Sequence, residues 1–289
     1  MLKRMIQVSL VILLIGVMMS LVYGLYLSNQ PEYDACLNVA FVGTAGEADC
    51  IVLWQRDFAM MIDTGEERDE KAIISFLSEQ NITKLNYLIL THPDKDHIGS
   101  AAALVRTMKV DRVIEPFYQK ENDRNRDLQV RLAQKQVKVI VPTRILHYTV
   151  NDMRISVFPP LERTYPDDNH YSLAVLVQHR DVAMLFPGDA TGVRLMELMK
   201  QKWDSINLYK LPYHGRYDDY SNLFYSELRP PLTVVTADQA SQRMTGTGNK
   251  WGTEWFYTVG HTVIFQSDGD KVQVLSPSEE PAKEDAASF

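Results

Sequence analysis

Three short, mainly apolar runs lie near the start of the chain: Asn38–Val42, Asp49–Trp54 and Phe58–Ile62. Turn residues separate the runs, and this pattern is typical of β-strands that follow one another closely. We therefore expect an antiparallel meander. The period changes in Glu67–Gln80, where apolar residues recur at the spacing of one helix face.

Helical and extended patterns alternate through the rest of the chain, which predicts a layered α/β domain over residues 36–275. Further helices are expected at Ala101–Lys109, Asp123–Gln136, Gly192–Lys200 and Asn222–Leu228. Further strands are expected at Tyr87–Leu90, Lys138–Val141, Arg154–Phe158, Leu173–Gln178, Ala183–Phe186, Ile206–Lys210 and Leu232–Thr236. The turn Ser267–Asp270 joins a final hairpin of Thr262–Gln266 and Lys271–Leu275. Residues 276–289 are polar and are predicted to be a disordered tail.

The N-terminal segment predicts a membrane anchor within residues 1–30. Met5–Leu27 contains no charged residue and is long enough to cross the roughly 30 Å hydrocarbon layer as a helix. Lys3 and Arg4 precede it, and a positive flank normally stays cytoplasmic. We therefore expect a single-pass protein of the cell membrane with its folded domain outside the cytoplasm. Cleavage after Gly24, which would release a secreted protein, is the alternative.

Composition narrows the class of protein. Hydrophobic residues make up 45% and charged residues 23%, as in ordinary globular proteins. The net charge of −7 gives no bulk attraction to nucleic acid and argues against a nonspecific DNA coat protein. With Cys36 and Cys50 as the two cysteines, a cysteine-rich zinc module is excluded, and two buried thiols are favoured over one disulfide.

The loop Thr91–Gly99 contains four side chains of the kinds that bind metal ions. It places His92, Asp94, Asp96 and His97 directly after a predicted buried strand. Imidazole nitrogens and carboxylate oxygens are ligands that zinc, manganese and iron accept. A capped polar surface loop would explain this grouping less well.

Two other predicted strands end in candidate ligands. Asp189 follows the apolar run Val182–Phe186, and His214 follows the strand Ile206–Lys210. Each motif is weak alone. Because strand ends lie along one edge of an α/β layer, these two side chains are expected to meet the His92 loop.

The order of these motifs resembles that of the metallo-β-lactamase superfamily, and most closely its ComEC-type branch, the metallohydrolase domains of bacterial competence DNA-internalisation proteins. The resemblance covers about Leu37 to Leu275. It is carried by Asn38–Gly43, Ala48–Val52, Met61–Gly65, Leu88–His97, Asn169–Leu173, Gly188–Ala190, Tyr213–Gly215 and Ser267–Gly269. It implies a four-layer αββα sandwich with a dinuclear metal site at one edge.

The resemblance also implies roles for individual residues. Two divalent ions, zinc or manganese, would be held by His92, Asp94, Asp96, His97, Asp189 and His214, with Asp189 between them. A hydroxide activated by the two metals would be the nucleophile, and Asp96 would also accept the proton of the attacking water.

Around these ligands, Asp63 would orient a ligand histidine, and Asn169 and Ser172 match the pattern of the branch. The superfamily's ligand histidine before the middle strand has no clear counterpart, and Asp168 or His170 would compensate. Lys210 and Arg216, which flank His214, would either meet an anionic substrate or face solvent.

These observations predict a membrane-tethered nuclease or phosphodiesterase acting on DNA or another nucleic acid. One alternative is a hydrolase of another ester, a lactone or an amide. Another is a non-catalytic binding module on a degenerate metal site, because Tyr213 stands where the branch usually has a histidine. No protein partner can be inferred.

Overall fold

The computed structural model describes residues 15–21 and 36–276 of the chain. The chain divides into two compact units, Met1–Cys36 and Leu37–Phe289. In the first unit, residues 15–21 form a helix. Within the described ranges, no helix has both the length and the apolar character needed to cross a bilayer. Most of the predicted anchor Met5–Leu27 lies outside these ranges, as do residues 277–289 of the predicted tail, so both stay predictions.

The first sheet of the second unit has eight strands in the order β17-β16-β1-β2-β3-β5-β7-β8. The strands from β17 to β3 are antiparallel, and β3, β5, β7 and β8 are parallel. Their bounds are β1 Leu37–Phe41, β2 Ile51–Gln55, β3 Phe58–Ile62, β5 Tyr87–Ile89, β7 Arg112–Ile114, β8 Lys138–Ile140, β16 Val263–Ser267 and β17 Val272–Ser276. The predicted meander and the predicted final hairpin both belong to this sheet.

The second sheet has seven strands in the order β15-β14-β13-β12-β11-β10-β9. Strands β9 to β12 are antiparallel, and β12 to β15 are parallel. Their bounds are β9 Leu146–Val150, β10 Met153–Phe158, β11 Ala174–His179, β12 Val182–Phe186, β13 Leu208–Lys210, β14 Leu232–Val235 and β15 Glu254–Tyr257. A separate short pair consists of β4 Lys84–Leu85 and β6 Lys109–Val110.

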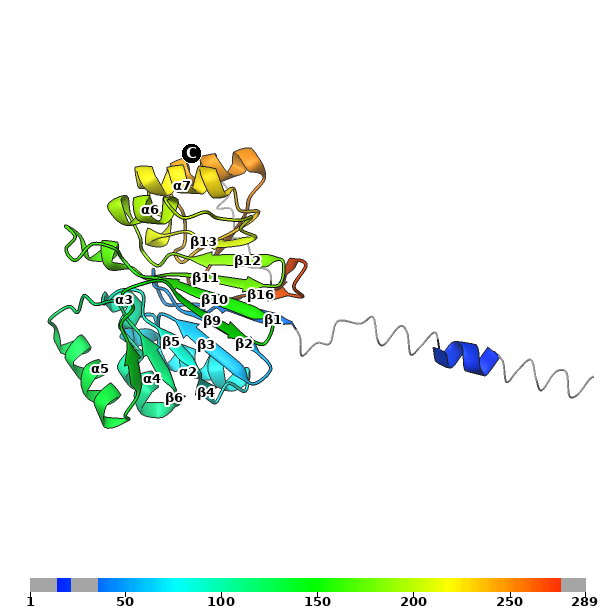
Figure 1. Ribbon diagram of the computed structural model, residues 1–289, viewed down its shortest axis with the longest axis horizontal. Helices are drawn as coiled ribbons and strands as arrows, with labels where there is room; N and C mark the ends of the chain where they lie inside the picture. The colour runs from blue at the N-terminus through cyan, green and yellow to red at the C-terminus, as the bar shows by residue number, and fades with distance from the viewer. Residues whose placement is uncertain (1–14, 22–35, 277–289) are drawn as a thin grey trace, which may run out of the picture. The chain divides into compact units, whose positions relative to one another are not determined.

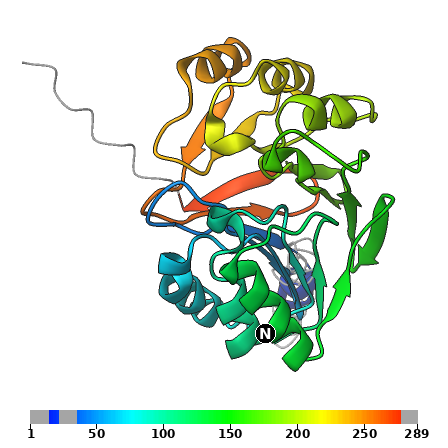
Figure 2. The ribbon, with the colours of Figure 1, turned by 90° about the vertical axis from the view of Figure 1, so that its left-hand side faces the viewer.

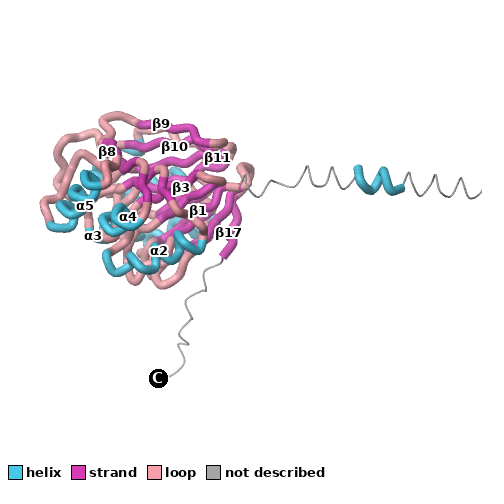
Figure 3. The backbone as a smooth tube through the Cα atoms, turned by 90° about the horizontal axis from the view of Figure 1, so that it is seen from below, coloured by secondary structure: helices cyan, strands magenta, loops and turns pink. Residues whose placement is uncertain are grey.

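Helices cover the outer faces of both sheets (Figures 1 and 2). Those packed on the first sheet are α2 Glu70–Glu79, α3 Lys95–Ile98, α4 Ala101–Thr107 and α5 Asp123–Gln134, seen from below in Figure 3. Those packed on the second are α6 Gly192–Met199, α7 Asp219–Leu228 and α8 Gln242–Gly248. Short 3-10 helices are η2 Glu67–Asp69, η3 Asp168–Tyr171, η4 Tyr213–Gly215 and η5 Asn249–Trp251. The unit is therefore a mixed α/β sandwich with layers in the predicted order of helix, sheet, sheet and helix.

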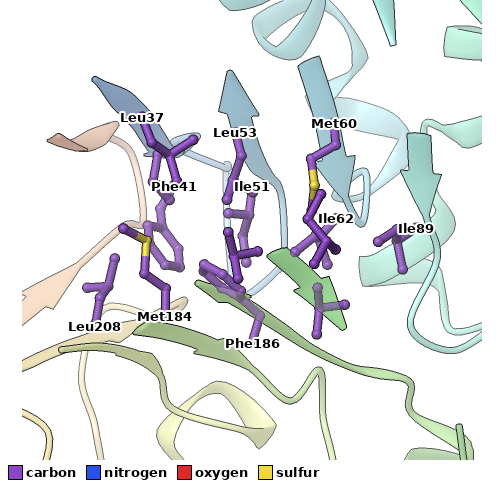
Figure 4. Close-up of a cluster of buried hydrophobic side chains, with 14 of the residues drawn as sticks. Leu37, Phe41, Ile51, Leu53, Met60, Ile62, Ile89, Met184, Phe186 and Leu208 are labelled. Atoms are coloured by element: carbon purple, nitrogen blue, oxygen red, sulfur yellow. The ribbon is translucent and has the colours of Figure 1, made fainter. Parts of the chain in front are cut away.

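An apolar layer between the sheets forms the main core. In β1, Leu37, Val39 and Phe41 face this layer, while Ala40 packs under the helices on the other face. This is the two-residue period of a strand. Phe186 of β12 meets them from the second sheet (Figure 4). Burying each large apolar side chain contributes roughly 1.5–3 kcal/mol, so the two sheets are held together mainly by this layer.

Several elements were not predicted, and each has a weak local pattern. Strand β7 has three residues, too few to show a period, and β9 is half-exposed along its length. Helix α8 contains Gly246 and Gly248, and glycine is a poor helix former. Cys36 and Cys50 are both buried, as predicted.

Candidate metal centre

Loops at the carboxyl ends of parallel strands bring the candidate residues together. Asp63 follows β3 and His92 lies just beyond β5, its parallel neighbour. In the second sheet, Asp189 follows β12 and His214 follows β13, again parallel neighbours. The loops of both sheets meet at one edge of the sandwich, where ligands collect in such folds.

Gly188 allows the loop that carries Asp189 to approach the loop that carries His92 closely. Its φ is +59°, a conformation that favours glycine, and a Cβ there would lie 2.8 Å from Thr91 Cβ and 3.2 Å from Ser172 Cβ. The Leu173 N–H also donates to Thr91 O at 2.9 Å. The Asp189 loop therefore packs directly on the His92 loop.

Four of the predicted ligands form a tight group. Asp189 Oδ2 lies 3.3 Å from His97 Nε2 and 3.1 Å from His214 Nε2. Asp96 Oδ2 lies 3.0 Å from His214 Nε2 and 3.7 Å from His97 Nε2. These side chains come from three segments far apart in the sequence, namely α3, the loop after β12 and η4, and their ligand atoms face one another.

The other two predicted ligands lie beside this group. The His92 ring centroid is 3.9 Å from that of His97, and His92 Nε2 is 3.7 Å from Asp94 Oδ2. Both histidines are buried, and in the described part of the chain neither Nε2 atom has a hydrogen-bond partner. Buried polar atoms are normally satisfied, and a divalent cation would satisfy both nitrogens. The residues present thus fit a metal centre.

The family model of the metallo-beta-lactamase superfamily matches residues 43–245. The chain belongs to this superfamily. ComE operon protein 3 of Bacillus subtilis (strain 168) is 26% identical over 171 residues, which are 58% of this chain and 22% of that protein. Recombination protein 2 of Haemophilus influenzae is 21% identical over 173 residues, 60% of this chain and 20% of that protein. The matches confirm the ComEC-type resemblance at low identity, and they span about a fifth of each relative.

Solved structures, among them a metallo-beta-lactamase fold protein, share the fold. YhfI from Bacillus subtilis superposes with a TM-score of 0.53 at 12% identity, covering 80% of this chain and 100% of YhfI. CmlA, a diiron β-hydroxylase from Streptomyces venezuelae, superposes with a TM-score of 0.51 at 12% identity, covering 83% of this chain and 54% of CmlA. At these identities the likeness concerns the fold alone.

In this metallo-beta-lactamase domain, Asp63 contacts the candidate ligand His97 at Nδ1, the ring nitrogen that faces away from the centre. Asp63 Oδ2 is 2.8 Å from His97 Nδ1 and accepts a hydrogen bond from the Thr91 hydroxyl at 2.6 Å. With Nδ1 engaged, His97 presents Nε2 to the centre. Ser172 Oγ is 3.4 Å from His92 Nδ1 and accepts from the Asp189 N–H. Asn169 accepts the Ser172 N–H through its backbone, and among the described contacts its side chain makes no hydrogen bond to the centre.

Of the two residues considered for the missing ligand, Asp168 lies on the His92 side of the centre. Lys120 Nζ is 2.7 Å from Asp168 Oδ2 and 2.8 Å from Asp94 Oδ1. His170 is buried beside Gly192 instead.

Asp49 and Lys210 belong to the centre, although the sequence analysis assigned neither to it. Lys210 is fully buried, with Nζ 2.6 Å from Asp49 Oδ2 and 3.0 Å from Asp189 Oδ1. The expectation that Lys210 meets substrate or solvent is therefore wrong. Arg216 is exposed and pairs with Glu47.

The oxygens of Asp49 are both engaged. Asp49 lies within 4.8 Å of His97, Asp189 and His214 by one ligand atom each. However, its Oδ1 accepts the Thr236 hydroxyl at 2.6 Å and its Oδ2 binds Lys210. The Asp96 side chain is 22% exposed and lacks a contact as close as that between Asp49 and Lys210 among the described residues. It is therefore a better fourth ligand than Asp49 beside His97, Asp189 and His214.

Burial and charge shift the ionisation of the histidines in opposite directions. Burial lowers the pKa of His92 to about 4, helped by His97, so His92 is neutral at pH 7, the form that binds metals. Burial would also lower the pKa of His214, but Asp189, Asp96 and Asp49 outweigh it and raise the pKa to about 9. Cation binding at His214 therefore requires the loss of a proton.

Asp189 and Asp96 both have lowered pKa values and stay ionised. Burial would raise the pKa of Asp189, but His214, Lys210 and His97 hold it well below its usual range. Burial acts in the same direction on Asp96, and the hydrogen bond from His214 together with the charges of His97 and His214 outweighs it, so the pKa of Asp96 is lowered as well. Both groups carry the negative charge that a divalent ligand set needs.

Proposed function

We propose that this chain is a metal-dependent hydrolase that uses two divalent ions, zinc or manganese, to cleave phosphodiester bonds of DNA or another nucleic acid. The observation that carries the proposal is a pair of buried nitrogens, His92 Nε2 and His97 Nε2, which lack a hydrogen-bond partner among the described residues and lie 3.7 Å from Asp94 Oδ2 and 3.3 Å from Asp189 Oδ2, respectively. An imidazole nitrogen left unsatisfied in a polar pocket is costly, and the superfamily membership points to a metal as its partner.

Residues of the chain orient the metal ligands and accept the proton of the attacking water. When bound, divalent ions lower the pKa of water and neutralise charge on a scissile phosphoryl group. Asp63 and Thr91 fix the His97 ring so that Nε2 faces the centre. Asp96 is the more exposed carboxylate of the tight group, 22% against 4% for Asp189, so we assign it contact with substrate and the proton of the attacking water.

The rim of the centre supports a nucleic-acid substrate. A surface hollow of about 460 Å³ adjoins the His92 loop at Lys95. It is lined by Arg68, Lys95 and Arg124 together with Glu66 and Glu67. Cationic side chains bind phosphates, and Lys95 lies between two candidate ligands in the sequence. Arg68 and Lys95 each pair with Glu66 at 3.0 Å, contacts that a phosphate would replace.

Aromatic side chains lie on the other flank, in the loop between β7 and α5. Phe117 is exposed, and Tyr118 stacks on Tyr171 with ring centroids 4.1 Å apart. Aromatic faces bind unpaired bases. A single-stranded substrate would use both the cationic hollow and these rings.

A panel assay tests the proposal. The 289-residue chain, purified in detergent and loaded with Mn²⁺ or Zn²⁺, is offered single-stranded DNA, duplex DNA, RNA and small phosphodiesters. We expect turnover of at least one nucleic acid, abolished by chelation and by Asp189→Asn. A chain that binds two equivalents of metal and cleaves none of these substrates contradicts the nuclease assignment.

A second candidate is hydrolysis of another ester, a lactone or an amide. It is favoured by the net charge of −7 and by Glu66 and Glu67 at the rim, which repel polyanions. Neutral esters and lactones added to the same panel separate the two candidates. A chain that binds no metal stoichiometrically would instead support the non-catalytic binding module.

We also propose that Met5–Leu27 anchors the domain to the outer face of the cell membrane. The support is the uncharged stretch behind Lys3 and Arg4. Protease added to intact cells should digest the domain, and complete protection contradicts this orientation. Recovery of the mature chain from the medium, starting after Gly24, would identify a cleaved signal instead.

A further inference from the structure

Thr236 lies between a candidate metal ligand and a buried carboxylate. It directly follows β14, and both Thr236 and Asp49 are buried. The Thr236 hydroxyl donates to Asp49 Oδ1 at 2.6 Å. His214 Nδ1 is 3.0 Å from the same hydroxyl oxygen and 3.2 Å from the Thr236 carbonyl oxygen. A series of contacts therefore runs from Asp49 through Thr236 to the His214 ring.

The chemistry of the groups fixes the direction of each hydrogen bond in this series. Lys210 Nζ lies 2.6 Å from Asp49 Oδ2. Burial would raise the pKa of Asp49, but Lys210 and two neighbouring histidines lower it, so Asp49 is a carboxylate that only accepts. Thr236 gives its one hydroxyl proton to Asp49, so its hydroxyl oxygen accepts from His214, as its carbonyl oxygen does. His214 must therefore carry a proton on Nδ1.

The other ring nitrogen of His214 faces the centre. Its Nε2 lies 3.1 Å from Asp189 Oδ2 and 3.0 Å from Asp96 Oδ2. A histidine that binds a metal normally donates its other ring N–H to an oxygen, which fixes both the tautomer and the orientation of the ring. Thr236 supplies two such oxygens, and Asp49 holds one of them in place.

Another pair of buried aspartate and threonine side chains supports His97. The Thr91 hydroxyl donates to Asp63 Oδ2 at 2.6 Å, and this oxygen is 2.8 Å from His97 Nδ1. Asp63 thus contacts its histidine directly. Asp49 Oδ1 is 3.5 Å from His214 Nδ1, and the threonine hydroxyl makes the closer contact.

We propose that Asp49 and Thr236 form a positioning pair for His214, in which Asp49 acts through the Thr236 hydroxyl and not as a metal ligand. This inference rests on the proposed function, in that the centre must bind divalent ions. Each oxygen of Asp49 already has a buried donor, Thr236 on Oδ1 and Lys210 on Oδ2. A ligand role for Asp49 would require one of these donors to leave.

The test measures metal affinity without any substrate. The 289-residue chain in detergent is stripped with a chelator and titrated with Zn²⁺ by calorimetry. Thr236→Val keeps the shape of the side chain and removes the hydroxyl, whereas Thr236→Ser keeps the hydroxyl. Thr233→Val is the matched control, because Thr233 is buried in β14 and its hydroxyl contacts Tyr225 rather than Asp49.

Thr236→Val should weaken Zn²⁺ binding by ten-fold or more, because groups that contact metal ligands change affinity by roughly 10–100-fold. Thr236→Ser and Thr233→Val should match the wild type. If Asp49 were instead a ligand, the valine would free its Oδ1, and binding would stay the same or become tighter. Thermal melts accompany each titration. Should Thr236→Val not fold, Thr236→Ala takes its place, because it admits a water to Asp49 and still lacks the fixed hydroxyl.

A second readout reports on the His214 ring itself. In the Zn²⁺-loaded chain with ¹⁵N-labelled histidine, the wild type should show a slowly exchanging proton on Nδ1 of His214, assigned by its absence from His214→Gln. The resonance should persist in Thr236→Ser, and in Thr236→Val it should shift and exchange faster with water. A purely structural disturbance of β14 would affect Thr233→Val equally.

Three results overturn the inference and leave the proposed metal centre intact. The first is unchanged or tighter Zn²⁺ binding by folded Thr236→Val. The second is an equal loss of affinity in Thr233→Val, and the third is an Nδ1 proton resonance that is the same in the wild type and Thr236→Val. A wild type that binds no metal overturns the proposed function itself, and the inference with it.

Discussion

The Lys210 ammonium lies 2.6 Å from the Asp49 carboxylate, and both side chains are buried. The pair joins β13 of the second sheet to the loop that precedes β2 of the first. Lys210 also reaches Asp189, so one internal cation balances two carboxylates of the centre. A buried charge left without its partner is strongly destabilising.

Lys210→Met should therefore lower the free energy of unfolding of the metal-free chain by about 3–5 kcal/mol. Urea denaturation followed by circular dichroism measures the loss. The surface variant Lys109→Met should change stability by less than about 1 kcal/mol. Equal denaturation midpoints for the two variants would show that the buried pair does not contribute as argued.

Asp96→Asn should abolish hydrolysis and leave the fold intact. The amide keeps the volume of the side chain but removes the charge that faces His214 and the centre. Changes around metal ligands cost roughly 10–100-fold, and loss of a ligand should cost at least that. Turnover of the best panel substrate is compared with that of Asp123→Asn, an almost fully exposed aspartate. Undiminished turnover in folded Asp96→Asn would remove Asp96 from the mechanism.

The stability of the metal-free chain should depend on pH through His214. Its pKa in the folded chain is raised to about 9 from the ordinary 6.5. A raised pKa contributes stability that is fully present below pH 6.5 and is lost as pH rises through 9. The loss across this window should be about 3 kcal/mol. Denaturation at several pH values checks it: His214→Gln should reduce the dependence, the remainder coming from His97, whose pKa is also raised, and His147→Gln, in the edge strand β9, should leave it unchanged.

Gly188→Ala should destabilise the domain and weaken metal binding. The added Cβ would lie 2.8 Å from Thr91 Cβ at a φ of +59°, which would push the His92 loop away from Asp189. Gly246→Ala in α8 is the matched control, because nothing lies within 4 Å of its Cβ position. That control should be neutral or slightly stabilising, since alanine is the better helix former. Thermal melts and Mn²⁺ titration compare the two, and equal behaviour would contradict the close-packing argument.

The sequence predicts the elements whose pattern is local. Strand β3 matches its predicted bounds Phe58–Ile62, because a strand covered on both faces is a continuous apolar run. The His92 loop is visible because four ligand-type residues stand together after such a run. The edge strand β9 is half-exposed and lacks this contrast.

Long-range pairs are harder to predict. Asp49 and Lys210 are far apart in the sequence, and their pairing depends on the packing of two sheets. One signal was available: Lys210 ends an apolar strand and is followed by Leu211, and a charge inside a buried run requires a partner. Asp168 and His170 could not be separated from sequence, because the turn of η3 decides which of them faces His92.

The pairing of β1 with β16 has a consequence for biosynthesis. Strand β1 is among the first parts of the domain to leave the ribosome, whereas its partner β16, Val263–Ser267, is among the last. Until β16 emerges, β1 has one row of backbone N–H and C=O groups without a strand to bind, and such an edge invites pairing with other chains. A nascent or truncated chain that stops before Val263 should therefore depend on chaperones, and the domain should reach its native state only after β16 has been synthesised.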